Sequence, residues 1–126
     1  MKSYYGPQAE AAGRIFAAIL NDLQPEPYDR ESNSLAANWP RVEKHSPQIL
    51  EMIELAIAKS ADSTVRERFS RIKVYVEFFV LYTKAYHTRK KEDLANLSTY
   101  SKTHPEYGMI VMYPGYIHWR NEEYFQ

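Results

Sequence analysis

The stretch VYVEFFVLY, residues 74–82, places one glutamate, Glu77, inside an otherwise apolar run. It belongs to the longest predicted helix, from near Thr64 to about Arg89. At about 100° per residue, the helix has a broad apolar face and a second apolar face opposite to it. The first face holds Val65, Phe69, Ile72, Val76, Phe79, Val80, Thr83 and Tyr86; the second holds Val74, Phe78, Leu81, Tyr82 and Ala85. A helix that is apolar nearly all round packs on both sides, so the stretch predicts the central helix of an all-α bundle.

The polar residues of this helix form a narrow seam between the two apolar faces. Its members are Arg66, Ser70, Lys73, Glu77 and Lys84. Glu77 follows Lys73 by four residues and precedes Lys84 by seven, so cations lie near it on the same strip. A buried general acid needs a raised pKa, which desolvation without a neighbouring cation produces. We therefore interpret Glu77 as a solvated or salt-bridged seam residue rather than a catalytic acid.

Three further helices are predicted around the central one. The first begins at Pro7, where a proline in the first turn costs no hydrogen bond, and ends before Pro25 and Pro27. Its apolar stripe is Ala12, Ile15, Phe16, Ile19 and Leu23. The second begins with Ser46 as N-cap and Pro47 in its first turn, and ends near residues 61–63. Its stripe is Ile49, Met52, Ile53, Ala56 and Ile57.

The last predicted helix covers residues 92–104, with Leu94, Leu97 and Ser101 on one side. Basic residues 89–91 suit the negative C-terminal end of the long helix before it. The fold prediction is an all-α bundle of about four helices, closed by an irregular aromatic C-terminal segment. In that segment Pro114-Gly115 fits either a hairpin turn or a break between two short helical turns.

Residues 24–46 are polar and interrupted by proline, which predicts a long connection between the first two helices. One short helical turn is expected at LAANW, residues 35–39. Long connections in compact domains are uncommon and usually pack down or carry a function. Trp39 is the expected anchor of this one.

Size and charge restrict the classes of partner. With 126 residues the chain is long enough for a single domain with its own core. Its 16 basic and 16 acidic residues cancel, so nothing favours a nucleic acid or a membrane as partner. Low net charge makes weak self-association plausible. The absence of cysteine excludes disulfides, thiolate metal sites and cysteine nucleophiles.

No motif for catalysis, metal or cofactor binding stands out. The four histidines, at positions 45, 87, 104 and 118, share no ligand spacing. No GxSxG, GxGxxG or phosphate-binding glycine loop is present. The adjacent carboxylates at 92–93 and 122–123 are typical of solvated surface. We expect no cofactor, no metal and no catalytic residue.

The aromatic tail is the most suggestive feature. Tyr113, Tyr116 and Trp119, together with Trp39, are the candidate ligand or interdomain contact residues. Such side chains offer flat faces with polar groups at the edge, which suit a glycan platform, a contact with another domain, or plain packing over the bundle. No sugar-specific polar cluster surrounds them, so contact with another domain is favoured over glycan binding.

The opening stretch YYGPQAEAAGRIFAAIL resembles a pattern of large bacterial glycoside-hydrolase-like proteins, related to α-glucuronidases and family 20 hexosaminidases. In those proteins a YG-P-x-A helix follows the catalytic barrel and begins a C-terminal helical region. Three more stretches fit that region: HSPQILEMIELAIAKSAD, TVRERFSRIKVYVEFFVLY and LANLSTYSKTHPEYGMIVMY. The resemblance covers most of the chain through loose helical patterns.

The resemblance implies that the chain is a single helical domain, residues 1–126, of a larger carbohydrate-active protein. It also implies a periplasmic or extracellular location and a neighbouring domain or a glycan as partner. The family's acid and base residues belong to the barrel, so no catalytic role transfers to this sequence. The alternative is a free-standing small helical enzyme or ligand-binding regulator, with an interhelical pocket that uses Glu77 together with Tyr75 or His87.

Overall fold

A computed structural model describes residues 2–23 and 38–104, and this part of the chain is helical without any strand. The four main helices are α2 (Ala9–Ala18), α4 (Trp39–Lys59), α5 (Ser63–Thr88) and α6 (Lys91–Thr103). A short helix α1 (Lys2–Tyr5) and a 3-10 turn η1 (Gly6–Gln8) precede α2, and a π-helical turn η2 (Ile19–Leu23) extends it. The all-α prediction is confirmed.

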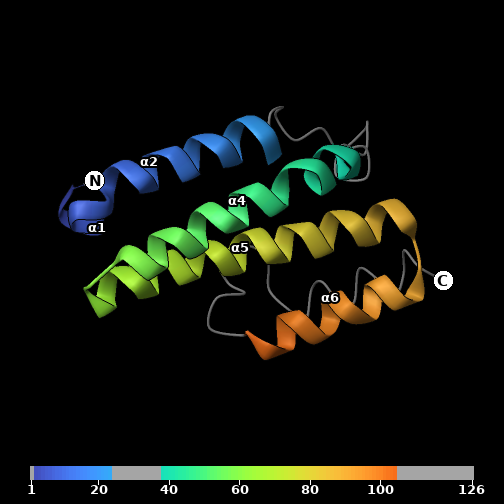
Figure 1. Cartoon of the computed structure of the whole chain (residues 1–126). Coiled ribbons are helices and arrows are strands. Elements are labelled where there is room, and N and C mark those ends of the chain that lie inside the picture. Colours follow the sequence, from blue (N-terminus) through green and yellow to red (C-terminus); the bar gives the residue numbers. More distant parts are fainter. Residues whose placement is uncertain (1, 24–37, 105–126) are drawn as a thin grey trace.

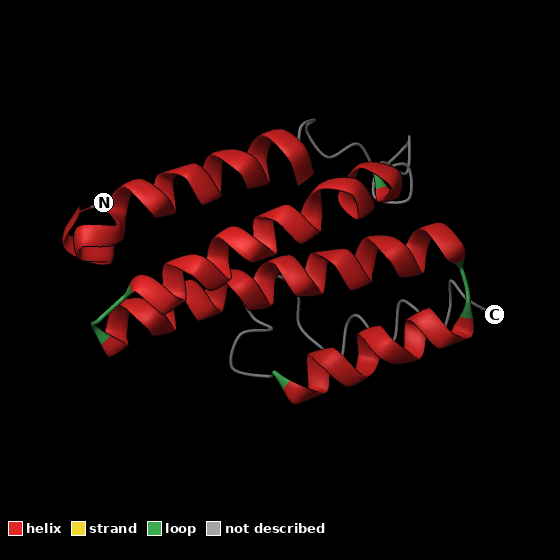
Figure 2. Cartoon of the chain, in the orientation of Figure 1, coloured by secondary structure: helices red, strands yellow, loops and turns green. Residues whose placement is uncertain are grey.

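The main helices lie side by side in their order along the chain (Figures 1 and 2). Residues 60–62 join α4 to α5 and residues 89–90 join α5 to α6, so successive helices run in opposite directions. α5 packs against α4 on one side and against α6 on the other. The prediction that this helix is central is therefore confirmed.

The two apolar faces of α5 explain its central place. The face toward α4 contributes Val65, Phe69, Ile72, Val76 and Phe79 to a core shared with α2 and α4. The opposite face contributes Phe78, Tyr82, Ala85 and Tyr86 to a second cluster, together with Leu97 of α6. Tyr86 was expected on the first face, but it lies in the second cluster. Apolar burial on both sides is the main stabilisation available to a helix of this kind.

The N-terminal segment is fixed against the start of α5. Gly6 has a φ of +54°, a left-handed conformation that glycine adopts at little cost, and there the chain turns from α1 into η1. The buried ring of Tyr5 lies 5.0 Å, between centroids, from that of Phe69. The Arg68 guanidinium lies 3.7 Å from the centroid of the Tyr4 ring. These contacts hold α1 close to α5.

The predicted start of α4 is wrong. The helix begins at Trp39, so Pro47 lies inside it and Ser46 is a buried helical residue rather than an N-cap. Pro40 occupies the first turn instead, where the missing N–H costs nothing. Packing explains why the helix continues through Pro47: the buried stripe begins at Val42 and includes Ser46 and Ile49 at helical spacing. The exposed proline ring points away from this stripe.

The end of α5 agrees with its predicted position near Arg89, but the lysines that follow it lie elsewhere than expected. α5 ends at Thr88, and Arg89 adopts the left-handed conformation with a φ of 57°. Lys91 is then the first residue of α6, so the two lysines stand at the start of α6 rather than at the end of α5. A left-handed residue after the last helical turn is a common way to end a helix, although glycine is the usual residue there.

Candidate functional site

The polar contacts between α5 and α6 form the candidate site. Glu77, Lys84 and Thr88 come from α5; Asp93 and Tyr100 come from α6. Helical spacing places the three α5 residues on one strip, because Lys84 follows Glu77 by seven residues and Thr88 follows Lys84 by four. Glu77 and Lys84 belong to the predicted polar seam, Thr88 extends it by one turn, and α6 contacts all three.

Tyr100 joins α6 to the middle of α5. Its hydroxyl donates a hydrogen bond to Glu77 Oε1 at 2.9 Å, and both side chains are half-buried. Burial first, and then the hydrogen bond and charge of Glu77, raise the pKa of Tyr100 above its ordinary value. The phenol therefore stays protonated at neutral pH and acts as a donor. It is unsuited to the role of a phenolate base.

The lysines near Glu77 pair with other carboxylates. Lys73 Nζ lies 2.5 Å from Glu54 Oε1 of α4. The hydrogen bond with Glu54 raises the pKa of Lys73, and the charges of Glu54 and Glu77 act in the same direction. Lys84 Nζ lies 3.7 Å from Asp93 Oδ1 of α6. The polar seam is therefore salt-bridged, as predicted. Its two lysines form ion pairs with carboxylates on the neighbouring helices α4 and α6.

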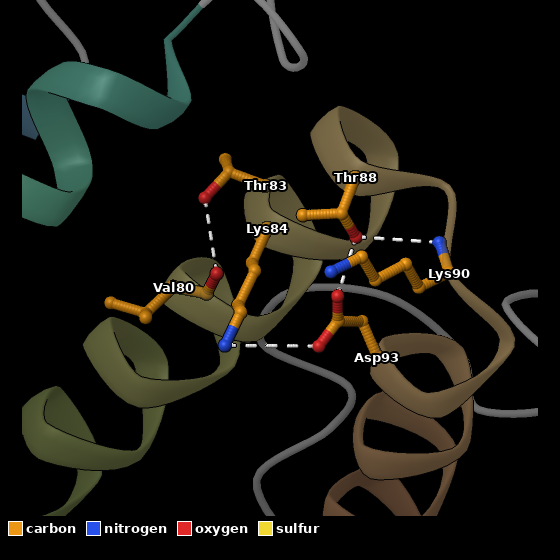
Figure 3. Close-up of polar contacts among 6 residues, drawn as sticks. All are labelled: Val80, Thr83, Lys84, Thr88, Lys90 and Asp93. Carbon is orange, nitrogen blue, oxygen red and sulfur yellow. Dashed lines mark hydrogen bonds and ion pairs between the residues drawn. The ribbon is translucent and has the colours of Figure 1, made fainter.

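Asp93 is the centre of a joint between α5 and α6 (Figure 3). Thr88 Oγ1 donates to Asp93 Oδ2 at 2.5 Å, and the Lys90 backbone N–H donates to Thr88 Oγ1 at 3.3 Å. Lys84 adds its ammonium from the side of α5. Asp93 is buried and lies in the first turn of α6, where the helix dipole favours a negative charge. The sequence had suggested a solvated carboxylate at this position, and that interpretation is wrong for Asp93.

The candidate contact residues are only partly placed. Trp39 begins α4, is half-buried and packs against the core shared by α2, α4 and α5. Tyr113, Tyr116 and Trp119 lie outside the described residues.

The alternative function, an interhelical pocket, needs the side chain of Tyr75 or His87 close to that of Glu77. Helix geometry keeps both of them away from it. Tyr75 precedes Glu77 by two residues, so its side chain points about 160° away around the helix. Its ring stacks on Phe79, with centroids 6.4 Å apart. His87 is exposed and lies ten residues beyond Glu77, roughly 15 Å along the axis. Glu77 directs its interhelical hydrogen bond to Tyr100.

Within residues 2–23 and 38–104, no three histidine, aspartate or glutamate side chains lie close enough together to hold a metal ion. His104 Nδ1 lies 3.1 Å from the Tyr100 carbonyl oxygen, and the two rings stack with centroids 4.2 Å apart. Over the same part of the chain, every helix is too short or too polar to span a bilayer.

Sequence reasoning missed Tyr100 and Asp93 as partners of the seam. A signal for Tyr100 existed, since it follows the buried Leu97 by three residues and so borders the stripe of α6 that packs on α5. Asp93 carried a weaker signal as an acid in a first helical turn. The polar contacts of Glu77, Lys84 and Thr88 with Tyr100 and Asp93 therefore hold α5 and α6 together.

Comparison of the chain with protein-family models, with curated proteins and with solved structures finds no match.

Proposed function

We propose that the chain is a non-catalytic helical module of a larger carbohydrate-active protein, which packs against a neighbouring domain. The observation that carries the proposal is the hydrogen bond from a protonated Tyr100 to Glu77, at 2.9 Å. Glu77, the acid of the alternative enzyme hypothesis, connects α5 to α6 through this hydrogen bond. Lys84 and Asp93 extend the same connection toward the start of α6.

The class of the larger parent protein is inferred from a resemblance. The chain resembles the helical region that follows the barrel in glycoside-hydrolase-like proteins. In this proposal, Tyr113, Tyr116 and Trp119 contact the neighbouring domain, and Trp39 anchors the start of α4. Tyrosine and tryptophan suit such a contact because they bury large area and keep a polar group for the rim.

The genomic reading frame provides the first test. A frame that continues upstream through a barrel domain supports the proposal. A frame that begins at Met1 and ends at Gln126 contradicts it.

A biochemical test uses the full-length parent and a panel of chromogenic glycosides. Glu77→Gln should leave every hydrolytic rate unchanged, because the catalytic residues lie in the barrel. A rate lost with Glu77→Gln and retained with Glu54→Gln would favour the alternative enzyme. Glu54 is the matched control because it is an exposed carboxylate on the neighbouring helix that also accepts an interhelical contact.

Glycan binding by the tail is the competing role, and Trp119→Ala separates the two. Contact with a domain predicts that this change destabilises the full-length protein and has little effect on residues 1–126 alone. A glycan platform predicts saturable binding of oligosaccharides by the chain, which Trp119→Ala removes without lowering its melting temperature.

A further inference from the structure

The turn between α5 and α6 has a sequence that favours helix. Its two residues, Arg89 and Lys90, are good helix formers, and no glycine or proline stands between residues 64 and 104. Arg89 nevertheless has a φ of 57°, a left-handed conformation that is unfavourable for a residue with a Cβ. The local sequence therefore favours one helix that continues from α5 into α6, and contacts between the two helices hold the turn.

α6 lies at the edge of the described bundle, with α5 between it and α4 (Figure 1). Among the described residues its main packing partner is α5, and the core shared by α2, α4 and α5 has no member from α6. Leu97 of α6 belongs to the second cluster, with Phe78, Tyr82 and Tyr86 of α5. α6 can therefore leave α5 without opening the first core, but these aromatic side chains then need another cover.

The polar contacts of α6 define which helix fits that face of α5. Tyr100 of α6 pairs with Glu77 of α5, and Asp93 of α6 pairs with Lys84 of α5. The two pairs are seven residues apart on either helix and follow opposite chain directions. Two antiparallel copies of a continuous α5–α6 helix can make the same pairs from one chain to the other. We propose that two copies of this chain exchange α6, so that each α6 packs on the α5 of the other copy.

The exchange keeps the contacts between α5 and α6 and relaxes the turn in both copies. Arg89 then adopts the helical conformation that its residue type prefers. The closed chain competes because its short connection keeps its own α6 at an effective concentration in the millimolar range. The 16 basic and 16 acidic residues cancel, so net charge adds little repulsion between copies. Pairs should therefore form as the chain approaches that concentration. This inference is independent of the proposed function.

Two substitutions of Arg89 test the exchange. Arg89→Ala and Arg89→Gly remove the same side chain and differ in backbone preference: alanine favours the continuous helix, and glycine favours the turn. Each pair of chains contains two such turns, so the dimer dissociation constant of Arg89→Ala should be at least about tenfold below that of Arg89→Gly. Sedimentation equilibrium up to roughly millimolar chain, after refolding from urea, measures both constants. Equal constants, or an Arg89→Ala chain that stays monomeric over this range, overturn the proposal.

A paramagnetic label shows which face the second copy uses. The protein has no cysteine and Asn96 is exposed on α6, so Asn96→Cys gives a single attachment site. The nitroxide-labelled chain is refolded together with an isotope-labelled chain that has no nitroxide, both with Arg89→Ala. Relative to a diamagnetic label, amides of residues 77–88 of the isotope-labelled chain should broaden, and those of residues 9–14 in α2 should stay sharp. Broadening that spares residues 77–88 means that the copies associate through another face, and contradicts the exchange.

Discussion

The hydroxyl of Tyr100 donates to Glu77 Oε1 at 2.9 Å and thereby connects α6 to the middle of α5. Glu77 is the acid in the otherwise apolar stretch of the central helix. Its position on the narrow polar strip explains how a helix that is apolar on two sides can carry a carboxylate. The carboxylate faces a donor on the adjacent helix and needs no pocket of its own.

We expect this hydrogen bond to couple the two residues in a double-mutant cycle. Tyr100→Phe and Glu77→Met should each remove the hydrogen bond and lower the free energy of unfolding, and the double variant should lose less than the sum. The coupling should be about 1 kcal/mol, typical of one interhelical hydrogen bond. Urea denaturation of the four proteins measures it, and strict additivity would contradict the contact.

The same contact predicts a dependence on alkaline pH. The folded state raises the pKa of Tyr100 above the ordinary 10.0, so the protonated phenol is favoured in the fold. Its stabilisation is fully present below pH 10 and is lost as pH rises through the raised value. Tyr100→Phe should therefore lose stability less steeply above pH 10 than the unsubstituted chain. Urea denaturation of both proteins at several pH values above 10 measures the two slopes, and equal slopes would contradict the contact.

Pro47 provides a prediction about α4. A proline inside a helix removes one backbone hydrogen bond and crowds the preceding turn, at a cost of about 3 kcal/mol relative to alanine. Since Pro47 is exposed, Pro47→Ala should raise the free energy of unfolding by about 1–3 kcal/mol. Pro40→Ala, in the first turn, should change it little. Thermal melts of both variants provide the comparison, and equal effects would be inconsistent with a helix that continues through Pro47.

The proline also shows where sequence reasoning reached its limit. Hydrophobic periodicity identified α5, its two faces and the stripes of the other helices, because burial produces that periodicity directly. It misplaced the start of α4, because a proline after a serine is a strong local start signal and the tertiary packing of Val42 outweighs it. The pairing of Lys73 with Glu54 was out of reach, since this contact depends on which helices are neighbours.

Asp62 should stabilise the start of α5. Its side chain accepts hydrogen bonds from the backbone N–H groups of Thr64, at 2.7 Å, and Val65, at 3.4 Å. Asp62→Ala should cost about 1 kcal/mol of unfolding free energy, the usual effect of losing an N-cap. Asp62→Asn retains an acceptor oxygen and should cost less. Chemical denaturation distinguishes the two, and an alanine variant as stable as the parent would contradict the cap.

Asp93 gives the last prediction, because its carboxylate joins two helices at a buried position. Asp93→Ala removes the acceptor of Thr88 and the partner of Lys84, and should destabilise the chain by about 1–3 kcal/mol. Lys84→Met removes the ammonium alone; that side chain is 43% exposed, so the loss should stay below about 1 kcal/mol. Thr88→Val tests the remaining contact and should fall between the two, since the nearly isosteric change removes a half-buried donor and leaves the ion pair. An order in which Lys84→Met costs more than Thr88→Val would mean that charge, rather than the short hydrogen bond from Thr88, holds the start of α6 against α5.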